Sequence, residues 1–221
     1  MSGYLIGLDY GTESARGILL DPRSGAIEGS HTHVYRHGVM TGALPEGTRL
    51  PPPWALQVAT DYTEAAAEIL GALGRDKQIE GIGLGFTAST PLPARADGTP
   101  LSMFYPSEPH AYVKLWKHQS AQPWADQINA RGGEFLRNFG GKVSGEWLLA
   151  KAAQLAEEAP NRWSALAILW PGSSGRFLVP SGSTRTSLRT TRPPPACVLA
   201  RTISWRLIGG TATVFHWEIL P

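Results

Sequence analysis

The chain has 221 residues, 42% of them hydrophobic, and a formal net charge of +2, which suits one good-sized domain. Its single cysteine, Cys197, excludes an internal disulfide and fits a reducing compartment. No apolar run approaches the roughly 20 residues that span a bilayer, and no basic region with an apolar signal core opens the chain, so we expect a cytoplasmic protein without a membrane partner.

The first predicted elements are two apolar strands, residues 4–8 and 15–21, joined by a glycine turn. A tight glycine turn lets backbone N–H groups approach an anion closely, and an adjacent carboxylate can serve Mg²⁺. The pattern indicates a phosphate-binding hairpin, although an ordinary hairpin stabilised by its Asp and Ser is the alternative. The candidate residues are Asp9, Gly11, Thr12, Glu13, Ser14 and Arg16.

The elements that follow alternate between strands and helices. In chain order they are a third strand over residues 26–35, a loop over 38–53, a helix over 61–73, a strand over 79–86, a hairpin over 92–103 about Asp97-Gly98, and helices over 122–130 and 144–158. Asp61 is expected to cap the first helix and Ser144 the last. A meander followed by alternating helices and strands predicts an α/β layer fold for residues 1–163.

Three segments are more specific than the turn. They are Leu50-Pro-Pro-Pro-Trp54-Ala-Leu-Gln57, Gly85-Phe86-Thr-Ala88-Ser-Thr90, and His110-Ala-Tyr-Val-Lys114-Leu-Trp116-Lys117-His118-Gln. With the glycine turn, they make residues 3–163 resemble the amino-terminal part of the ribulokinase branch of the FGGY carbohydrate kinase family. The resemblance implies an incomplete ribonuclease H-like (actin-like ATPase) domain. It also implies ATP-dependent phosphorylation of a ketopentose, L-ribulose to L-ribulose 5-phosphate, in L-arabinose catabolism.

The resemblance also implies site roles. Asp9 would act on Mg²⁺, the turn from Gly11 to Ser14 would face the phosphates of ATP, and Arg16 would help to hold the transferred phosphoryl group. For the sugar, Trp116 would provide an aromatic platform, Lys117 and His118 donors, and Ala88 a small contact.

Plainer interpretations exist for the sugar residues. Trp116 is alternatively a buried core residue, and Lys117 and His118 alternatively start a helix or act indirectly. Lys114, in an alternating stretch, is predicted to be solvated. Gly85 departs from the family pattern, which has an acidic residue before the Phe-Thr pair, so we expect an altered substrate loop.

The resemblance ends near residue 163, and the composition changes there. Residues 164–221 carry six Arg, no Lys and a single acid, Glu218, and residues 172–196 have no helix or strand periodicity. The family's catalytic base and adenine-binding domain have no counterpart, so we expect the chain to be inactive alone. Reading a gene out of frame would produce such a tail.

Three other functional classes are alternatives for this sequence. A natural basic arm would bind an anionic partner, but its aromatics do not alternate with arginine, so nucleic acid is not expected. A non-catalytic actin-like or Hsp70-like nucleotide-binding module would lack the Trp116 platform. A degenerate interaction protein would need the basic tail to be real.

Overall fold

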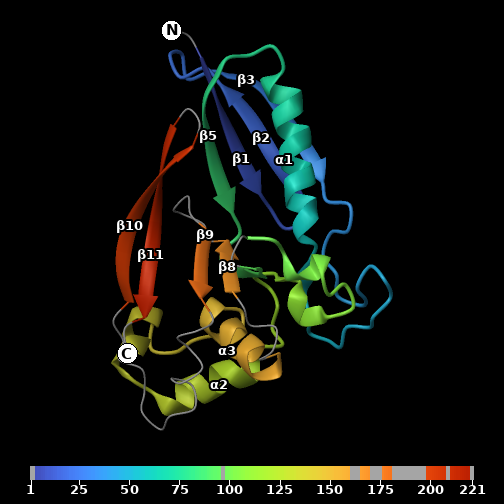
Figure 1. The fold of residues 1–221 in the computed structure, drawn as a ribbon, viewed down its shortest axis with the longest axis vertical. Helices are drawn as coiled ribbons and strands as arrows, with labels where there is room; N and C mark the ends of the chain where they lie inside the picture. Colours follow the sequence, from blue (N-terminus) through green and yellow to red (C-terminus); the bar gives the residue numbers. More distant parts are fainter. Residues whose placement is uncertain are drawn as a thin grey trace.

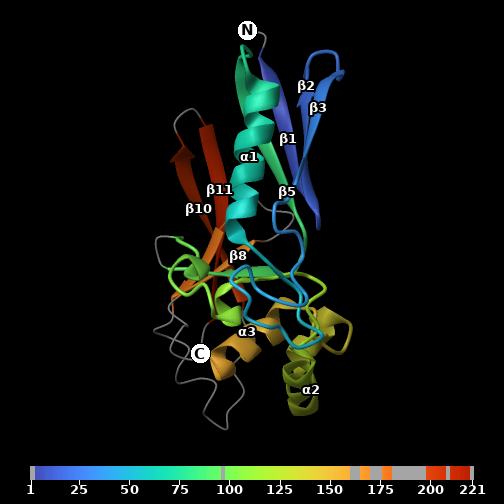
Figure 2. The same cartoon turned by 90° about the vertical axis from the view of Figure 1, so that its right-hand side faces the viewer.

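The computed structural model describes residues 3–95 and 98–159 with their side chains. Further along, it describes the backbone of four strands: β8 (Ala165–Leu169), β9 (Arg176–Pro180), β10 (Val198–Leu207) and β11 (Gly210–Ile219). Figures 1 and 2 give two views of the ribbon.

A four-stranded sheet of order β3-β2-β1-β5 forms the first layer. Strands β1 (Tyr4–Tyr10), β2 (Ser14–Leu20) and β3 (Ile27–Val34) are an antiparallel meander, and β5 (Ile79–Phe86) lies parallel to β1. Helix α1 (Ala59–Gly74) runs along one face of this sheet, as Figures 1 and 2 show. The predicted meander, helix and following strand are therefore confirmed.

The core of this layer forms between α1 and the inward side chains of β1 and β2. Ile69 and Leu73 of α1 share one buried cluster with Ile6, Leu8 and Leu19. Close approach of α1 to β2 depends on Gly17, because an added Cβ there would lie 2.2 Å from a methyl carbon of Ile69. The opposite face of the sheet carries Asp9, in register with Arg16 of β2.

The second part of the described chain lies beyond the carboxyl ends of β1 and β5, as Figure 1 shows. It contains β4 (Leu56–Gln57), β6 (Thr90–Pro93), β7 (Val113–Lys114), α2 (Gln122–Arg131) and α3 (Leu148–Glu158), with 3₁₀ helices at Leu101–Met103, Pro109–Ala111 and Glu134–Phe139. Strand β4 pairs with β7, which brings the segment around Gln57 beside the one that precedes Trp116.

Two predicted helix caps are wrong. Helix α1 starts at Ala59 after Val58, and the carboxylate of Asp61 instead accepts hydrogen bonds from the backbone N and ring Nδ1 of His37, at 3.0 and 2.7 Å. Helix α3 starts at Leu148, because the Gly145 amide donates to the side chain of Gln122 at 3.0 Å and draws residues after Ser144 into a turn.

The hairpin expected over residues 92–103 forms only at its turn end, where the amide of Arg95 donates to the carbonyl of Thr99 and that of Gly98 to the carbonyl of Arg95, each at 2.8 Å. Ala94 bridges to Pro100, but Leu101–Met103 is a 3₁₀ helix rather than a return strand. Strand β6 takes β8 as its antiparallel partner. Asp97, at the predicted turn, lies outside the described residues.

The chain beyond residue 163 differs from expectation at one described place. Residues 172–196 were expected to hold no strand, and β9 lies among them, paired antiparallel with β8. Strands β10 and β11 pair with each other. The rest of that range is outside the described residues, so the boundary near 163 and the frameshift remain predictions. Within the described part, no helix is long and apolar enough to cross a membrane.

Candidate functional site

The glycine turn between β1 and β2 is closed by its own backbone and by β3. The amide of Gly11 donates to the carbonyl of Ser14 at 2.9 Å, and the amide of Tyr35 donates to the carbonyl of Glu13 at 3.0 Å. The Tyr35 hydroxyl donates to the Gly11 carbonyl at 3.1 Å. The amides of Thr12 and Glu13 donate to no acceptor in the described chain. The turn therefore presents two fixed N–H donors, which suits an anion.

A carboxylate and a guanidinium lie beside this turn on the sheet face opposite α1. Asp9 is exposed, in register with Arg16 on one side and Gly85 on the other. These three residues help to line an open groove of about 420 Å³. In the part of the chain that the structure describes, Asp9 has no ion-pair partner, so its oxygens suit a divalent cation.

The departure at Gly85 lies next to Asp9. An added Cβ at Gly85 would stand 3.2 Å from Oδ1 of Asp9. An acidic side chain at this position would therefore place a second carboxylate against the first. The altered residue bears on the charge of the candidate metal site as well as on the substrate loop.

Trp116 lies against the glycine turn although 104 positions separate it from Thr12. Its indole N–H donates to Oγ1 of Thr12 at 3.0 Å, and its side chain is 41% exposed, so it is not a core tryptophan. The side-chain amide of Gln57 donates to the Thr12 carbonyl at 2.6 Å. An accessible aromatic ring and the candidate phosphate turn are thus held together from two sides.

The loop between β5 and β6 carries Ala88 at the surface. Thr90 shapes this loop by donating from its hydroxyl to the Ala88 carbonyl at 2.9 Å. Ser89 adopts a positive φ of 50°, which is rare for a residue with a side chain. Lys151 of α3 reaches both this loop and the Trp116 segment: its ammonium donates to the carbonyls of Ser89 and Trp116 at 2.8 and 3.1 Å.

The other two sugar candidates are placed differently. Lys117 is half-buried and forms no hydrogen bond or ion pair with a described residue. His118 is fully buried: its Nδ1 accepts from the amide of Ala55 at 3.2 Å, and its Nε2 faces the side-chain oxygen of Gln154 at 3.2 Å. Burial lowers the pKa of His118 to about 3. Its neutral ring contacts Gln154 of α3. His118 therefore lies in the interior and not beside Trp116 at the surface.

The prediction that Lys114 is solvated is wrong. Its side chain is 1% exposed, and its ammonium lies 3.3 Å from Nδ1 of His110 and 4.5 Å from the centre of the Trp54 ring. Nε2 of His110 lies 2.8 Å from a carboxylate oxygen of Glu158. Burial lowers the pKa of Lys114 to about 7 and that of His110 to about 3.

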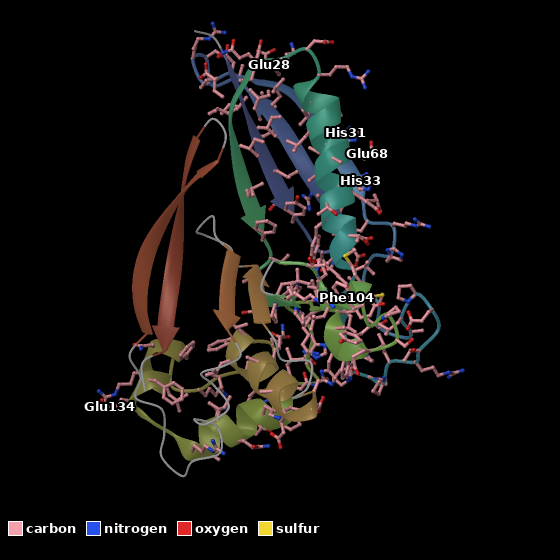
Figure 3. The ribbon with its side chains drawn as sticks, viewed as in Figure 1. Glu28, His31, His33, Glu68, Phe104 and Glu134 are labelled. Atoms are coloured by element: carbon pink, nitrogen blue, oxygen red, sulfur yellow. The ribbon has the colours of Figure 1, made fainter. Side chains whose placement is uncertain are left out.

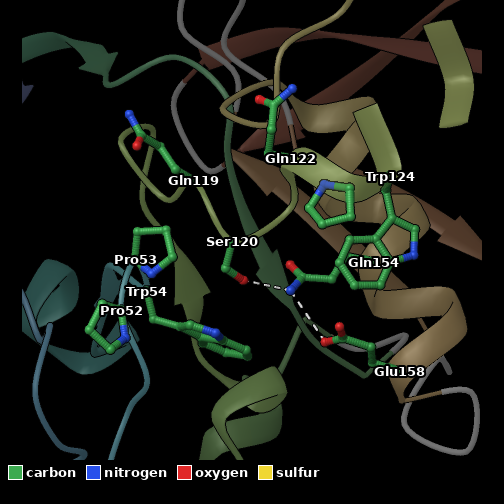
Figure 4. Close-up of a pocket in the computed structure, with 10 residues that line it drawn as sticks. Pro52, Pro53, Trp54, Gln119, Ser120, Gln122, Trp124, Gln154 and Glu158 are labelled. Carbon is green, nitrogen blue, oxygen red and sulfur yellow. Dashed lines mark hydrogen bonds between the residues drawn. The ribbon is translucent and has the colours of Figure 1, made fainter. Parts of the chain in front are cut away.

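A second groove opens near α2 and α3 and is drawn in Figure 4. Trp54 and Trp124 contribute to its wall, and Gln154 donates to Ser120 at 2.7 Å and to Glu158 at 3.2 Å. Gln154 donates both of its amide hydrogens to neighbouring side chains, so it offers no free hydrogen-bond donor to a ligand in this groove.

Polar side chains also gather where β3 runs beside α1. Figure 3 labels His31 and His33 of β3 and Glu68 of α1 along the outer side of the sheet layer. Among the described residues, no group of three or more His, Cys, Asp and Glu side chains could hold a metal ion. A metal at the glycine turn would therefore need oxygens from its phosphate ligand or water in addition to Asp9.

Two residues of this site, Gln57 and Lys151, were not predicted from the sequence. Gln57 appears in the Trp-Ala-Leu-Gln run, and Lys151 interrupts the apolar face of its helix. A lysine on a core-facing helical position was the available signal, because such a position normally selects an apolar residue.

Comparisons with known proteins find clear relatives. The chain is 44% identical to a ribulokinase of Mycolicibacterium smegmatis, over 74% of the chain and 31% of the relative, and 45% identical to one of Bacillus licheniformis, over 70% and 30%. No family model matches the chain. The chain spans about 30% of the length of these two ribulokinases.

Solved structures with the same fold are sugar kinases. A gluconate kinase from Lactobacillus acidophilus superposes with a TM-score of 0.58 at 17% identity, covering 74% of this chain and 30% of that one. A Plasmodium falciparum glycerol kinase with ADP superposes with a TM-score of 0.57 at 13% identity, covering 73% and 30%. The predicted incomplete ribonuclease H-like sugar kinase fold is confirmed.

Proposed function

We propose that this chain, which is related by sequence to the ribulokinases over about 72% of its length, is part of an ATP-dependent kinase that phosphorylates L-ribulose or a similar ketopentose. Phosphoryl transfer depends mainly on positioning and on neutralising charge, and Mg²⁺ supplies much of that neutralisation when it is bound with ATP. Asp9 would hold the metal, and the amides of Thr12 and Glu13, with the Ser14 hydroxyl, would hold phosphate oxygens.

One observation carries the proposal: the indole N–H of Trp116 donates to the hydroxyl of Thr12 at 3.0 Å. A kinase must bring the terminal phosphate of ATP next to the accepting hydroxyl of the sugar. Here the aromatic ring on which a sugar would stack touches the turn that would bind phosphate. Arg16 lies opposite Asp9 in the sheet and would neutralise the charge of the transferred group.

The chain alone is expected to be inactive. It spans about 30% of its relatives' length, and the family resemblance matches none of its residues to the catalytic base. General-base catalysis contributes roughly 10²–10⁴-fold, so its absence alone would suppress turnover. We propose that the parent enzyme works in the cytoplasm with ATP and Mg²⁺.

A chimera tests the proposal directly. Residues 3–159 replace the matching segment of the Mycolicibacterium smegmatis ribulokinase, and ATP-dependent phosphorylation of L-ribulose is measured. We expect activity. Asp9→Ala should lower kcat strongly while leaving ribulose binding without nucleotide nearly unchanged. Trp116→Ala should weaken ribulose binding by about 5- to 150-fold, the equivalent of ~1–3 kcal/mol.

The control is Glu68→Gln, an exposed change on the outer side of α1. It should leave both kcat and ribulose affinity unchanged. If Asp9→Ala abolished ribulose binding in the absence of nucleotide, or if Trp116→Ala left it intact, the assigned metal and sugar roles would be incorrect.

A further inference from the structure

We propose that Lys151 is a positioning residue of the sugar site, whose buried ammonium holds the Ala88 loop and the Trp116 segment in one arrangement. The inference rests on the proposed function, because it concerns the same sugar site. The ammonium donates to the carbonyls of Ser89 at 2.8 Å, Leu115 at 2.6 Å and Trp116 at 3.1 Å. A lysine ammonium has three N–H donors, so each of them is used.

The position of Lys151 in α3 would ordinarily favour an apolar residue. Its side chain is 0% exposed, and burying a charge without a paired opposite charge is costly. In the described chain, no carboxylate lies within ion-pair distance of it. In the described chain, the ammonium donates hydrogen bonds to these three carbonyls alone, so its effect is to fix their positions.

The first of these carbonyls belongs to a strained residue. Ser89 has a φ of 50°, and a left-handed conformation in a residue other than glycine persists only where its surroundings hold it. The Lys151 ammonium donates a hydrogen bond to the Ser89 carbonyl, and the Thr90 hydroxyl donates one to the Ala88 carbonyl at 2.9 Å. Together they set the direction in which Ala88 faces the surface.

The other two carbonyls fix the backbone that carries the aromatic platform. Lys151 binds the carbonyls of Leu115 and Trp116, and the Trp116 ring then reaches Thr12 of the glycine turn. A continuous series of hydrogen bonds thus runs from the Ala88 loop through Lys151 and Trp116 to the turn that would bind phosphate. Lys151 itself has no need to touch the sugar.

The test compares Lys151→Met with the wild-type full chain at about pH 6, below the pKa of about 7 to which burial lowers Lys151, so that its amine carries the third proton. Methionine has a similar length but no donors, so it should fill the same space in α3 and release the three carbonyls. Backbone hydrogen exchange should accelerate in residues 87–90 and 113–117, while α1 stays protected. The matched control is Lys142→Met, which removes an exposed ammonium and should change neither segment.

A second measurement separates positioning from stability. L-ribulose binding, followed by tryptophan fluorescence, should weaken at least about 10-fold in the folded fraction of Lys151→Met. The free energy of unfolding is measured in parallel, because removing a buried charge raises it and leaving three carbonyls without a donor lowers it. A residue that is merely structural would lower the stability and leave the affinity of the folded fraction unchanged.

The outcomes separate this inference from the proposed function. Unchanged exchange in residues 87–90 and 113–117 would overturn the inference, as would wild-type ribulose affinity in Lys151→Met. If neither the wild-type chain nor the chimera binds L-ribulose, the proposed function fails, and accelerated exchange of the two segments still supports the link that Lys151 makes.

Discussion

Replacing Lys114 with Met should stabilise the fold at neutral pH and weaken the dependence of stability on pH. Lys114 is 1% exposed, and among the described residues its ammonium has one hydrogen-bonding neighbour, Nδ1 of His110 at 3.3 Å. Burial lowers its pKa from 10.5 to about 7. Because this folded-state pKa lies below the unfolded one, the unfolded chain binds more protons between pH 7 and 10.5, so stability rises with pH across that window.

The magnitude follows from the size of the shift. Within the window, a lysine of this kind changes the free energy of unfolding by about 2–3 kcal/mol between pH 7.5 and 9.5. Lys151 adds a similar amount, since burial also lowers its pKa to about 7. The charge of Lys114 also helps to lower the pKa of Lys151, so Lys114→Met should keep at most about half of the wild-type gain in stability over this interval.

The other buried groups in contact with these lysines, and buried Tyr112, titrate outside the interval. His110 and His118 have pKa values lowered to about 3 by burial, so their titration ends below pH 7.5. Tyr112 has a pKa raised to about 12 by burial and titrates above pH 9.5. The difference in stability between the two pH values therefore reports mainly on the buried lysines.

The assay is urea unfolding at pH 7.5 and 9.5, followed by tryptophan fluorescence, for the wild type, Lys114→Met and the exposed control Lys142→Met. The control should behave like the wild type. If Lys114→Met keeps the full wild-type gain in stability between the two pH values, Lys114 is not a buried cation in the folded protein, and the reasoning from desolvation is refuted.

Three further substitutions test the packing and charge of the site. Trp116→Phe keeps a ring but loses the hydrogen bond to Thr12, and a double-mutant cycle with Thr12→Val in urea unfolding should give a coupling of about 1 kcal/mol. Gly85→Asp places a second carboxylate beside Asp9 and should cost about 1 kcal/mol of stability in EDTA, with excess Mg²⁺ reversing the loss. Gly17→Ala should lower the unfolding free energy by about 1–3 kcal/mol, because its Cβ would meet α1 at 2.2 Å.

For each of these three substitutions, one comparison would contradict the expected result. Additive effects of Trp116→Phe and Thr12→Val would mean that their hydrogen bond contributes nothing to stability. Asp9→Asn in the Gly85→Asp background should abolish the response to Mg²⁺, and a persisting response would place the metal elsewhere. Gly83→Ala is the control for Gly17→Ala, because an added Cβ at Gly83 meets nothing within 4 Å; equal losses would exclude the close packing of α1 as the cause.

Much of the fold follows from local patterns in the sequence. The strands around the glycine turn and the strand over residues 79–86 form where their apolar runs predict them, because alternation and turn residues act within a few positions. The helix ends were less predictable. Asp61 and Ser144 look like N-caps, yet Asp61 binds His37 and the chain after Ser144 is held by Gln122.

The sequence by itself determined the glycine turn and the segments shared with sugar kinases, because a short run of residues carries each of them. Only the tertiary structure decided that Trp116 meets Thr12 and that Lys114 and Lys151 are buried. A lysine's spacing in a strand or helix does not reveal which distant carbonyls or rings surround it. For Lys151 those carbonyls come from a strained loop and a second segment that meet only when the chain has folded.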